Sequence, residues 1–196
     1  MESNGETVNG GVIMDAQSLV PALEALLFSS PEPLSLAALK RVFGEDVPGE
    51  TIHAGLELLK ARSMEPGRGV MLVEVALGWQ YLTREEYFPF VEKIAKTAKE
   101  ERITAAGIET LSIVAYKQPL TRAEVDAIRG AASGNHIRLL MDRGLVKVSG
   151  RAELPGAPFL YGTTKQFLKH FGLRSLEDLP DPKDLGRVIS EQLASN

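Results

Sequence analysis

The feature that most constrains the fold of this chain is a series of helix and strand signals that occurs twice along its 196 residues. In each copy, three segments with apolar residues at helical spacing precede two short apolar runs that are typical of a β-hairpin. Pro33-Leu34-Ser35 matches Pro119-Leu120-Thr121 at an offset of 86 residues, and Trp79 to Thr83 matches Phe159 to Thr163 at an offset of 80. Loops a few residues shorter in the second copy would produce this drift. The repeat therefore predicts one supersecondary unit used twice.

The order of helix, helix, helix and hairpin within each copy is that of the winged helix-turn-helix. The predicted fold class is mainly α (α+β), with two tandem winged-helix domains, each a helix-turn-helix plus a β-hairpin wing. The expected segments are a disordered N-terminal tail over residues 1–17, an N-terminal winged-helix domain over 18–83, a linking helix over 84–102, a C-terminal winged-helix domain with C-terminal helices over 103–180 and a flexible tail over 181–196.

Short polar residues and glycines indicate where the helices of the first copy begin and end. Ser35 is a candidate N-cap for a short second helix that Gly44 ends. The hairpin strands are expected over residues 70–77 and 79–82, with Gly78 at the break between them.

The second copy carries clearer capping signals. Thr121 and Glu124 match a capping box, and Gly144 lies where a left-handed C-cap is expected. A second wing is expected over residues 145–148 and 159–161, and short helices begin near Thr163 and Ser175. A further capping box, Thr83-Arg84-Glu85-Glu86, is expected to open the linking helix and extend it to about Lys99.

Composition and motifs offer no support for an enzyme. The chain has no cysteine, which excludes disulfides, thiolate-ligated metals and thiol nucleophiles. The three histidines, His53, His136 and His170, lack metal-ligand spacing, and no phosphate-binding loop or nucleophile elbow occurs. No apolar run approaches the ~18 residues that would cross a membrane. We therefore expect a cytoplasmic, non-membrane protein with no metal and no cofactor.

Charge is distributed unevenly along the chain. Residues 1–102 hold 10 basic and 16 acidic side chains, a net charge of −6, whereas residues 103–196 hold 12 and 10, a net charge of +2. The basic residues concentrate around the predicted third helix and wing of the second copy, at Arg129, Arg138, Arg143, Lys147 and Arg151. Two interpretations remain open for this segment, namely contact with phosphates or an acidic partner helix, and an ordinary solvated face.

Aromatic side chains alternate along the predicted wing strands, as Trp79 and Tyr81 in the first copy and Phe159 and Tyr161 in the second. Alternation places each pair on one face of its hairpin. We expect that face to pack on the domain's own helices, and a base-stacking platform is the alternative.

Several blocks of sequence resemble the bacterial segregation and condensation protein B family. The resemblance covers residues 23–180, and its blocks occur in order at the expected spacing. The matching blocks are residues 108–124, Ile128-Arg129-Gly130, Arg138-Leu139-Leu140, Arg143-Gly144-Leu145, residues 158–164, Phe167-Leu168, Phe171-Gly172-Leu173 and residues 175–180.

This resemblance implies a non-enzymatic adaptor that forms a homodimer, mainly through the N-terminal domain. The dimer of this family binds the kleisin ScpA, which bridges the heads of the SMC ATPase during chromosome condensation and segregation in cell division. It further implies a protein associated with the nucleoid that touches DNA indirectly or weakly.

Within that interpretation, six residues of the second copy are the expected partner contacts: Tyr116, Pro119, Arg122, Arg129, Arg138 and Tyr161. The alternative is a winged-helix transcriptional regulator that places the helix from Ser133 to Arg143 in a DNA major groove.

Overall fold

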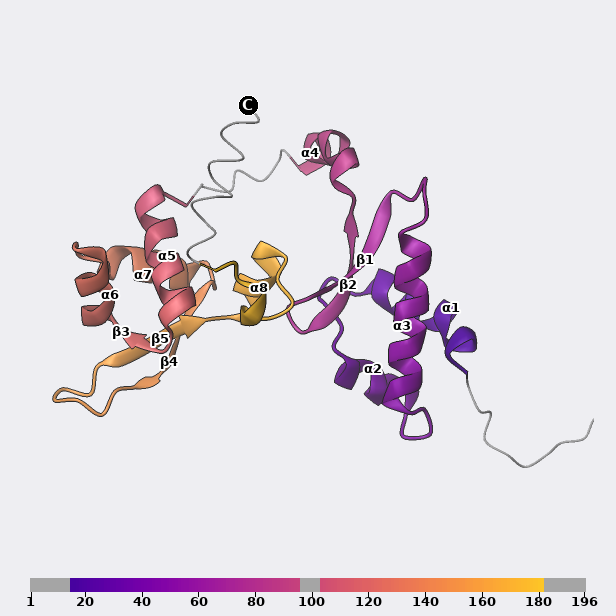
Figure 1. Cartoon of the computed structure of the whole chain (residues 1–196), viewed down its shortest axis with the longest axis horizontal. Coiled ribbons are helices and arrows are strands. Elements are labelled where there is room, and N and C mark those ends of the chain that lie inside the picture. The colour runs from indigo at the N-terminus through magenta and orange to yellow at the C-terminus, as the bar shows by residue number, and fades with distance from the viewer. Residues whose placement is uncertain (1–14, 96–102, 182–196) are drawn as a thin grey trace, which may run out of the picture. The chain divides into compact units, whose positions relative to one another are not determined.

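The computed structural model of this chain describes residues 15–95 and 103–181 (Figure 1). The chain divides into two compact units, of which the first holds residues up to Glu74 and 78–94, and the second holds 75–77 and the residues from Ala95 onward. The expected tail over residues 1–17 is wrong at its end, because Asp15 caps the first helix, and Ala16 and Gln17 belong to it. The rest of that tail, residues 182–196 and the end of the linking helix lie outside the described residues.

The first unit has the predicted order of three helices and a hairpin. A short 3₁₀ turn and a further helix follow the hairpin. The elements are α1 (Ala16–Ser29), α2 (Leu36–Phe43), α3 (Gly49–Ser63), β1 (Val70–Val75), β2 (Gly78–Thr83), η1 (Glu85–Tyr87) and α4 (Phe88–Ala95).

Side-chain caps begin the first two helices. The Asp15 carboxylate accepts a hydrogen bond from the backbone N–H of Ser18 at 2.8 Å, and the Ser35 hydroxyl accepts one from Ala38 at 3.2 Å. Gly44 ends α2 with a φ of +86°, a backbone conformation that favours glycine. The predicted cap at Ser35 and stop at Gly44 are confirmed.

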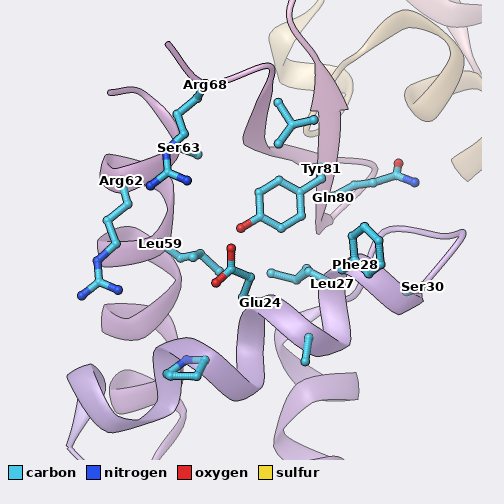
Figure 2. A pocket seen from close by; sticks show the side chains of 13 residues that line it. Glu24, Leu27, Phe28, Ser30, Leu59, Arg62, Ser63, Arg68, Gln80 and Tyr81 are labelled. Atoms are coloured by element: carbon cyan, nitrogen blue, oxygen red, sulfur yellow. The ribbon is translucent and has the colours of Figure 1, made fainter. Parts of the chain in front are cut away.

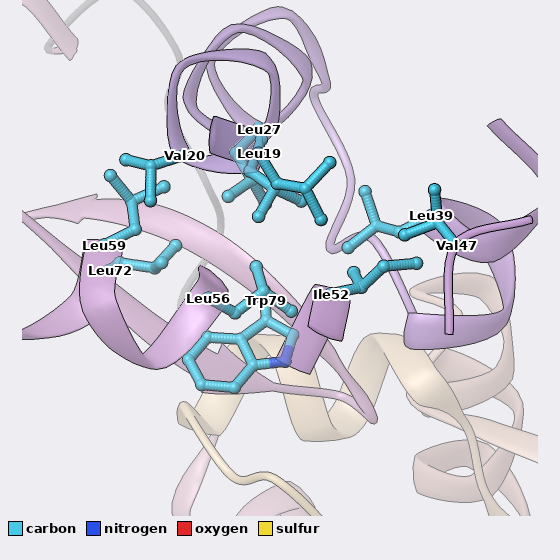
Figure 3. Packing of buried hydrophobic residues seen from close by; sticks show 11 residues of the cluster. Leu19, Val20, Leu27, Leu39, Val47, Ile52, Leu56, Leu59, Leu72 and Trp79 are labelled. Carbon is cyan, nitrogen blue, oxygen red and sulfur yellow. The ribbon is translucent and has the colours of Figure 1, made fainter. Parts of the chain in front are cut away.

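The core of the first unit lies between its three helices and the hairpin (Figure 3). Each fully buried leucine or isoleucine contributes roughly 1.5–3 kcal/mol relative to an exposed one. Trp79 is 4% exposed, which confirms that the first of the wing aromatics packs on its own helices. The buried side chains are Leu19, Val20, Leu23, Leu27, Leu39, Val47, Ile52, Leu56, Leu59, Leu72 and Trp79.

The hairpin turns at Ala76 and Leu77, which have φ values of +51° and +63°. The expected break at Gly78 is therefore wrong, because Gly78 is the first residue of β2. Glycine is required at position 78 for another reason, namely that the backbone of Pro33 and Leu34 passes very close to it. A Cβ atom there would lie 2.9 Å from the carbonyl carbon of Leu34, whose backbone pairs with Trp79 in an antiparallel bridge.

The expected capping box at Thr83 is also wrong. Arg84 precedes the 3₁₀ turn as its cap residue, and no side chain caps that turn. The Arg84 N–H donates to the carbonyl of Gly69, the residue directly before β1, at 3.1 Å. The Arg84 guanidinium donates to the Ser63 carbonyl at 3.0 Å and closes the end of α3. Helix α4 is described as far as Ala95.

The second unit repeats the helix order and adds a third strand. Its elements are α5 (Ala105–Lys117), β3 (Leu120–Thr121), α6 (Arg122–Arg129), α7 (Gly134–Asp142), β4 (Val146–Arg151), β5 (Phe159–Thr163), α8 (Lys165–Phe171) and η2 (Leu176–Asp178). The sheet order is β3-β5-β4, with both pairs antiparallel. Strand β3 was not predicted, because two residues are too few to show a strand period.

The predicted caps of the second unit are confirmed. The Glu124 carboxylate accepts from the Thr121 N–H at 2.7 Å, while the Thr121 hydroxyl accepts from the Glu124 N–H at 3.3 Å. Gly144 has a φ of +68°, and the following Leu145 N–H donates to the Leu140 carbonyl at 2.9 Å, as in a Schellman motif. The hydroxyl of Thr164 caps α8, and that of Ser175 caps η2.

Candidate protein-binding surfaces

The six predicted contact residues differ in how exposed they are and in whether their side chains already make bonds within the unit. Tyr116 lies in the last turn of α5 and is half-buried, and Pro119 is exposed directly before β3. Tyr161 lies on β5 and is half-buried opposite Leu120 of β3. These three therefore gather around the end of α5 and the β3–β5 strand pair.

Arg129 is held inside the second unit. Its Nε donates to the Glu109 carboxylate at 2.9 Å, its Nη1 donates to the Ala132 carbonyl at 2.8 Å, and its side chain is 10% exposed. Those bonds join α5 to the turn between α6 and α7, so Arg129 positions these helices.

Arg122 and Arg138 are exposed. The Arg122 Nε lies 3.8 Å from the Asp126 carboxylate in an open i,i+4 ion pair, an arrangement worth little in water. Arg138 lies on the outward side of α7. Both guanidinium groups can reach a bound partner, and only the weak Arg122–Asp126 ion pair competes with such a contact.

The second wing only partly follows the expected packing of aromatic residues. Phe159 is 44% exposed, so the expectation that it packs on the helices is wrong. The Arg151 guanidinium covers its ring instead, at 4.2 Å from the centroid, and also donates to the Ala157 carbonyl at 2.9 Å. The Phe159 ring therefore packs against the Arg151 guanidinium in a cation–π contact and not against a helix.

A small apolar pocket lies beside Tyr116 in the second unit. Its volume is ≈ 280 Å³. The Tyr116 hydroxyl donates to the Pro180 carbonyl at 2.6 Å, and desolvation, with the nearby Asp181 carboxylate, raises the pKa of Tyr116. The lining residues come from α5, α8 and the segment after α8: Ile108, Leu111, Ser112, Ala115, Tyr116, Phe167, Phe171, Leu173, Leu179 and Pro180.

A larger groove of ≈ 730 Å³ lies in the first unit, between α1, the end of α3 and the hairpin (Figure 2). The buried side chains of Leu27 and Leu59 contribute to its lining, and Phe28 is 86% exposed beside it. Arg62 and Arg68 contribute cations from α3 and the loop that follows it. This groove was not predicted from the sequence, although Phe28, a large apolar residue directly after Leu27, is a visible signal.

Polar groups inside the groove are incompletely satisfied. The Tyr81 hydroxyl and the Glu24 carboxylate point toward one another (Figure 2), and desolvation, with the Glu24 charge, raises the pKa of Tyr81. Gln80 donates through Nε2 to the Pro31 carbonyl at 3.0 Å, but its Oε1 is buried and accepts no hydrogen bond.

A third surface lies on α4. Phe90 and Ile94, four residues apart and therefore on the same side of the helix, are 66% and 83% exposed, and Phe88 at the start of the helix is 57% exposed. Large apolar side chains grouped on one short helix are typical of a protein-binding surface.

Within residues 15–95 and 103–181, no three His, Cys, Asp or Glu side chains are grouped so that they could hold a metal ion. No helix in the same ranges is long and apolar enough to span a membrane.

Comparison with known proteins identifies the family. Residues 21–182 match the model of the segregation and condensation complex subunit ScpB. The segregation and condensation protein B of Syntrophotalea carbinolica is 39% identical over 178 residues, which are 91% of this chain and 89% of that protein. The protein of the same name from Desulforamulus reducens is 45% identical over 159 residues, with coverages of 81% and 86%.

Solved structures of the same name were also found. ScpB from Mycobacterium tuberculosis is 34% identical, with 82% of this chain and 98% of that chain covered and a TM-score of 0.39. A dimer of a ScpB N-terminal domain in complex with a ScpA peptide is 32% identical, with coverages of 39% and 98% and a TM-score of 0.36. The match to the family model and the two curated relatives confirm the resemblance noted in the sequence, and this chain belongs to the segregation and condensation protein B family.

Proposed function

We propose that this protein is a non-enzymatic adaptor that binds the kleisin ScpA as a homodimer and, through ScpA, the SMC ATPase on the nucleoid. Each unit acts as a winged-helix domain that contacts protein. Membership of the family supports the role in chromosome segregation and condensation. The partner ScpA is taken from the solved complex of a ScpB N-terminal domain with a ScpA peptide.

The observation that carries the proposal is the groove beside Phe28 in the first unit. It combines an apolar lining with two arginines, Arg62 and Arg68. An amphipathic helix fits such a groove, because its apolar face covers the leucines while its acidic side chains meet the arginines. The 86% exposed Phe28 would be the anchor of this contact, as buried aromatic residues are in other interfaces.

The second unit adds charged contacts in this proposal. Arg122 and Arg138 remain candidates for direct contact, together with Tyr116, Pro119 and Tyr161. Arg129 acts as a positioning residue, because its guanidinium is already bound by Glu109 and Ala132.

Dimerisation through the N-terminal unit is supported by the exposed apolar side chains of α4, of which Phe90 and Ile94 share one side of the helix. Covering Phe88, Phe90 and Ile94 with a second copy would remove from water the most exposed apolar side chains of that helix. Sedimentation of the full chain at several concentrations tests this part of the proposal.

The groove is tested by calorimetry of the full chain with ScpA. Phe28→Asp should weaken binding by about tenfold or more, since a charge would replace an interface anchor. Val42→Asp is the matched control, because Val42 is 63% exposed on α2 and does not line the groove. Equal affinity of the two variants would remove the groove from the proposal, and no binding by the unmodified chain would overturn the proposal itself.

A further inference from the structure

The small apolar pocket beside Tyr116 lies where the described chain ends. Leu179 and Pro180 form part of its wall, and the Tyr116 hydroxyl holds the Pro180 carbonyl at 2.6 Å. The described residues stop at Asp181, and 15 more residues follow in the sequence. Any apolar group in the first few of those residues is therefore tethered to the edge of the pocket.

The pocket is apolar and open. Ile108 on α5 and Phe171 on α8 line it and are 43% and 44% exposed, although both belong to side-chain types that favour burial. With ≈ 280 Å³ it is slightly below the roughly 300–1,000 Å³ of small-molecule sites. A few aliphatic side chains would fill it and cover both residues.

The remaining sequence supplies such side chains at a regular spacing. Leu185, Val188, Ile189 and Leu193 recur at i, i+3, i+4 and i+8, the spacing that places residues on one face of a helix. Between them lie polar and charged residues, among them Arg187 and Glu191. The pattern is amphipathic, and its apolar face needs a partner surface.

The short distance in sequence between Pro180 and Leu185 favours the C-terminal segment as the occupant of the pocket. Leu185 lies five residues after Pro180, so at ~3.3–3.6 Å per residue it stays within about 18 Å of the pocket wall. A short tether gives an effective concentration in the millimolar range, so even a weak contact would be well populated.

We propose that residues 183–193 bind in cis to the pocket formed by α5, α8 and the Leu173 to Pro180 segment, through Leu185, Val188 and Ile189. This binding covers Ile108 and Phe171. It is independent of the ScpA groove in the first unit.

The absence of cysteine from the chain allows an unambiguous crosslinking test. The full chain carrying Ile108→Cys and Val188→Cys should form an intramolecular disulfide about tenfold faster than the chain carrying Ile128→Cys and Val188→Cys. Ile128 is the matched control, because it is 55% exposed on α6 and does not line the pocket. Adding Leu185→Ser, Ile189→Ser and Leu193→Ser should remove the difference in rate.

Three results would overturn the proposal. Equal rates for the Ile108 and Ile128 pairs would show that the segment has no preference for the pocket. A disulfide that links two chains, recognised on non-reducing gels and by its dependence on protein concentration, would show that a second copy occupies it. Thermal unfolding under reducing conditions confirms that each variant is folded, and hydrogen exchange of α5 and α8 in a chain ending at Asp181 gives an independent reading. Unchanged exchange there would also contradict the proposal.

Discussion

Single residues in this protein differ in whether their role is local or depends on distant parts of the chain. Gly78 has no unusual backbone conformation, yet its missing side chain is what lets the Leu34 backbone pair with Trp79 across 45 residues of sequence. Arg129 lies in the basic segment, yet it is bound by Glu109 and Ala132. In both cases the role follows from a neighbour that is remote in sequence.

Replacement of Gly78 by alanine should therefore destabilise the first unit. The new Cβ would lie 2.9 Å and 3.0 Å from the carbonyl carbons of Leu34 and Pro33, and neither backbone atom can move away cheaply. We expect a loss of about 1–3 kcal/mol in the free energy of unfolding, measured by urea titration. Gly69→Ala is the control, because the nearest atoms there are Tyr87 ring carbons at 3.9 Å or more, and a similar loss in both variants would contradict the steric explanation.

At the scale of helices and strands, the ends are set by local chemistry and the pairings by the rest of the fold. Ser35, Thr121 and Gly144 were identified from the sequence because caps act within four residues. Strand β3 and the cap residue Arg84 were not, because each depends on a residue distant in sequence, Leu160 and Tyr161 in one case and Gly69 in the other. The groove beside Phe28 was missed for the same reason, since α1, α3 and the hairpin form it together.

Three carboxylates that cap or brace helix ends in the second unit have lowered pKa values. The side chain and then the backbone of Ser133 lower the pKa of Asp126, the Thr121 backbone and hydroxyl lower that of Glu124, and the Arg174 side chain and backbone lower that of Asp178 to about 2. A depressed folded-state pKa adds stability above the unfolded-state value and loses it as pH falls through the folded-state value.

The second unit should therefore lose stability progressively from about pH 4 downward, as the unfolded-state values near 4 imply. Asp126→Asn should reduce this slope, because the amide cannot take up a proton, whereas Glu153→Gln in the exposed wing loop serves as the control. Urea unfolding followed by circular dichroism between pH 6 and 2 measures how the free energy of unfolding depends on pH. An unchanged slope in Asp126→Asn would show that its bonds to Ser133 do not carry the pH dependence.

At the scale of the whole chain, the sequence repeat predicted two compact units, and the structure has two. Composition alone did not predict the function. The net charge of −4 is the sum of an acidic first part and a slightly basic second part. Arg122, Arg138 and Lys147 are exposed in the second part, but Arg129 is largely buried and Arg151 covers Phe159. The cations free to meet phosphates are fewer than the sequence count indicated.

Binding of the full chain to duplex DNA should accordingly be weak and lost at about 0.15 M salt, because affinity for DNA depends on the number of phosphates neutralised. Gel-shift titrations at two salt concentrations measure this. A retained complex with a steep salt dependence, weakened by Arg138→Glu, would favour the transcriptional regulator over the adaptor.

The burial of Trp79 makes the protein its own optical probe. The chain has a single tryptophan, and it lies 4% exposed in the core of the first unit. The His53 ring meets it edge-on with centroids 6.2 Å apart, and the Lys60 ammonium lies 5.5 Å from its centroid. Indole fluorescence therefore reports melting of the first unit alone, while circular dichroism sees the helices of both. A difference between the two melting curves measures how far the two halves unfold separately, with no label added.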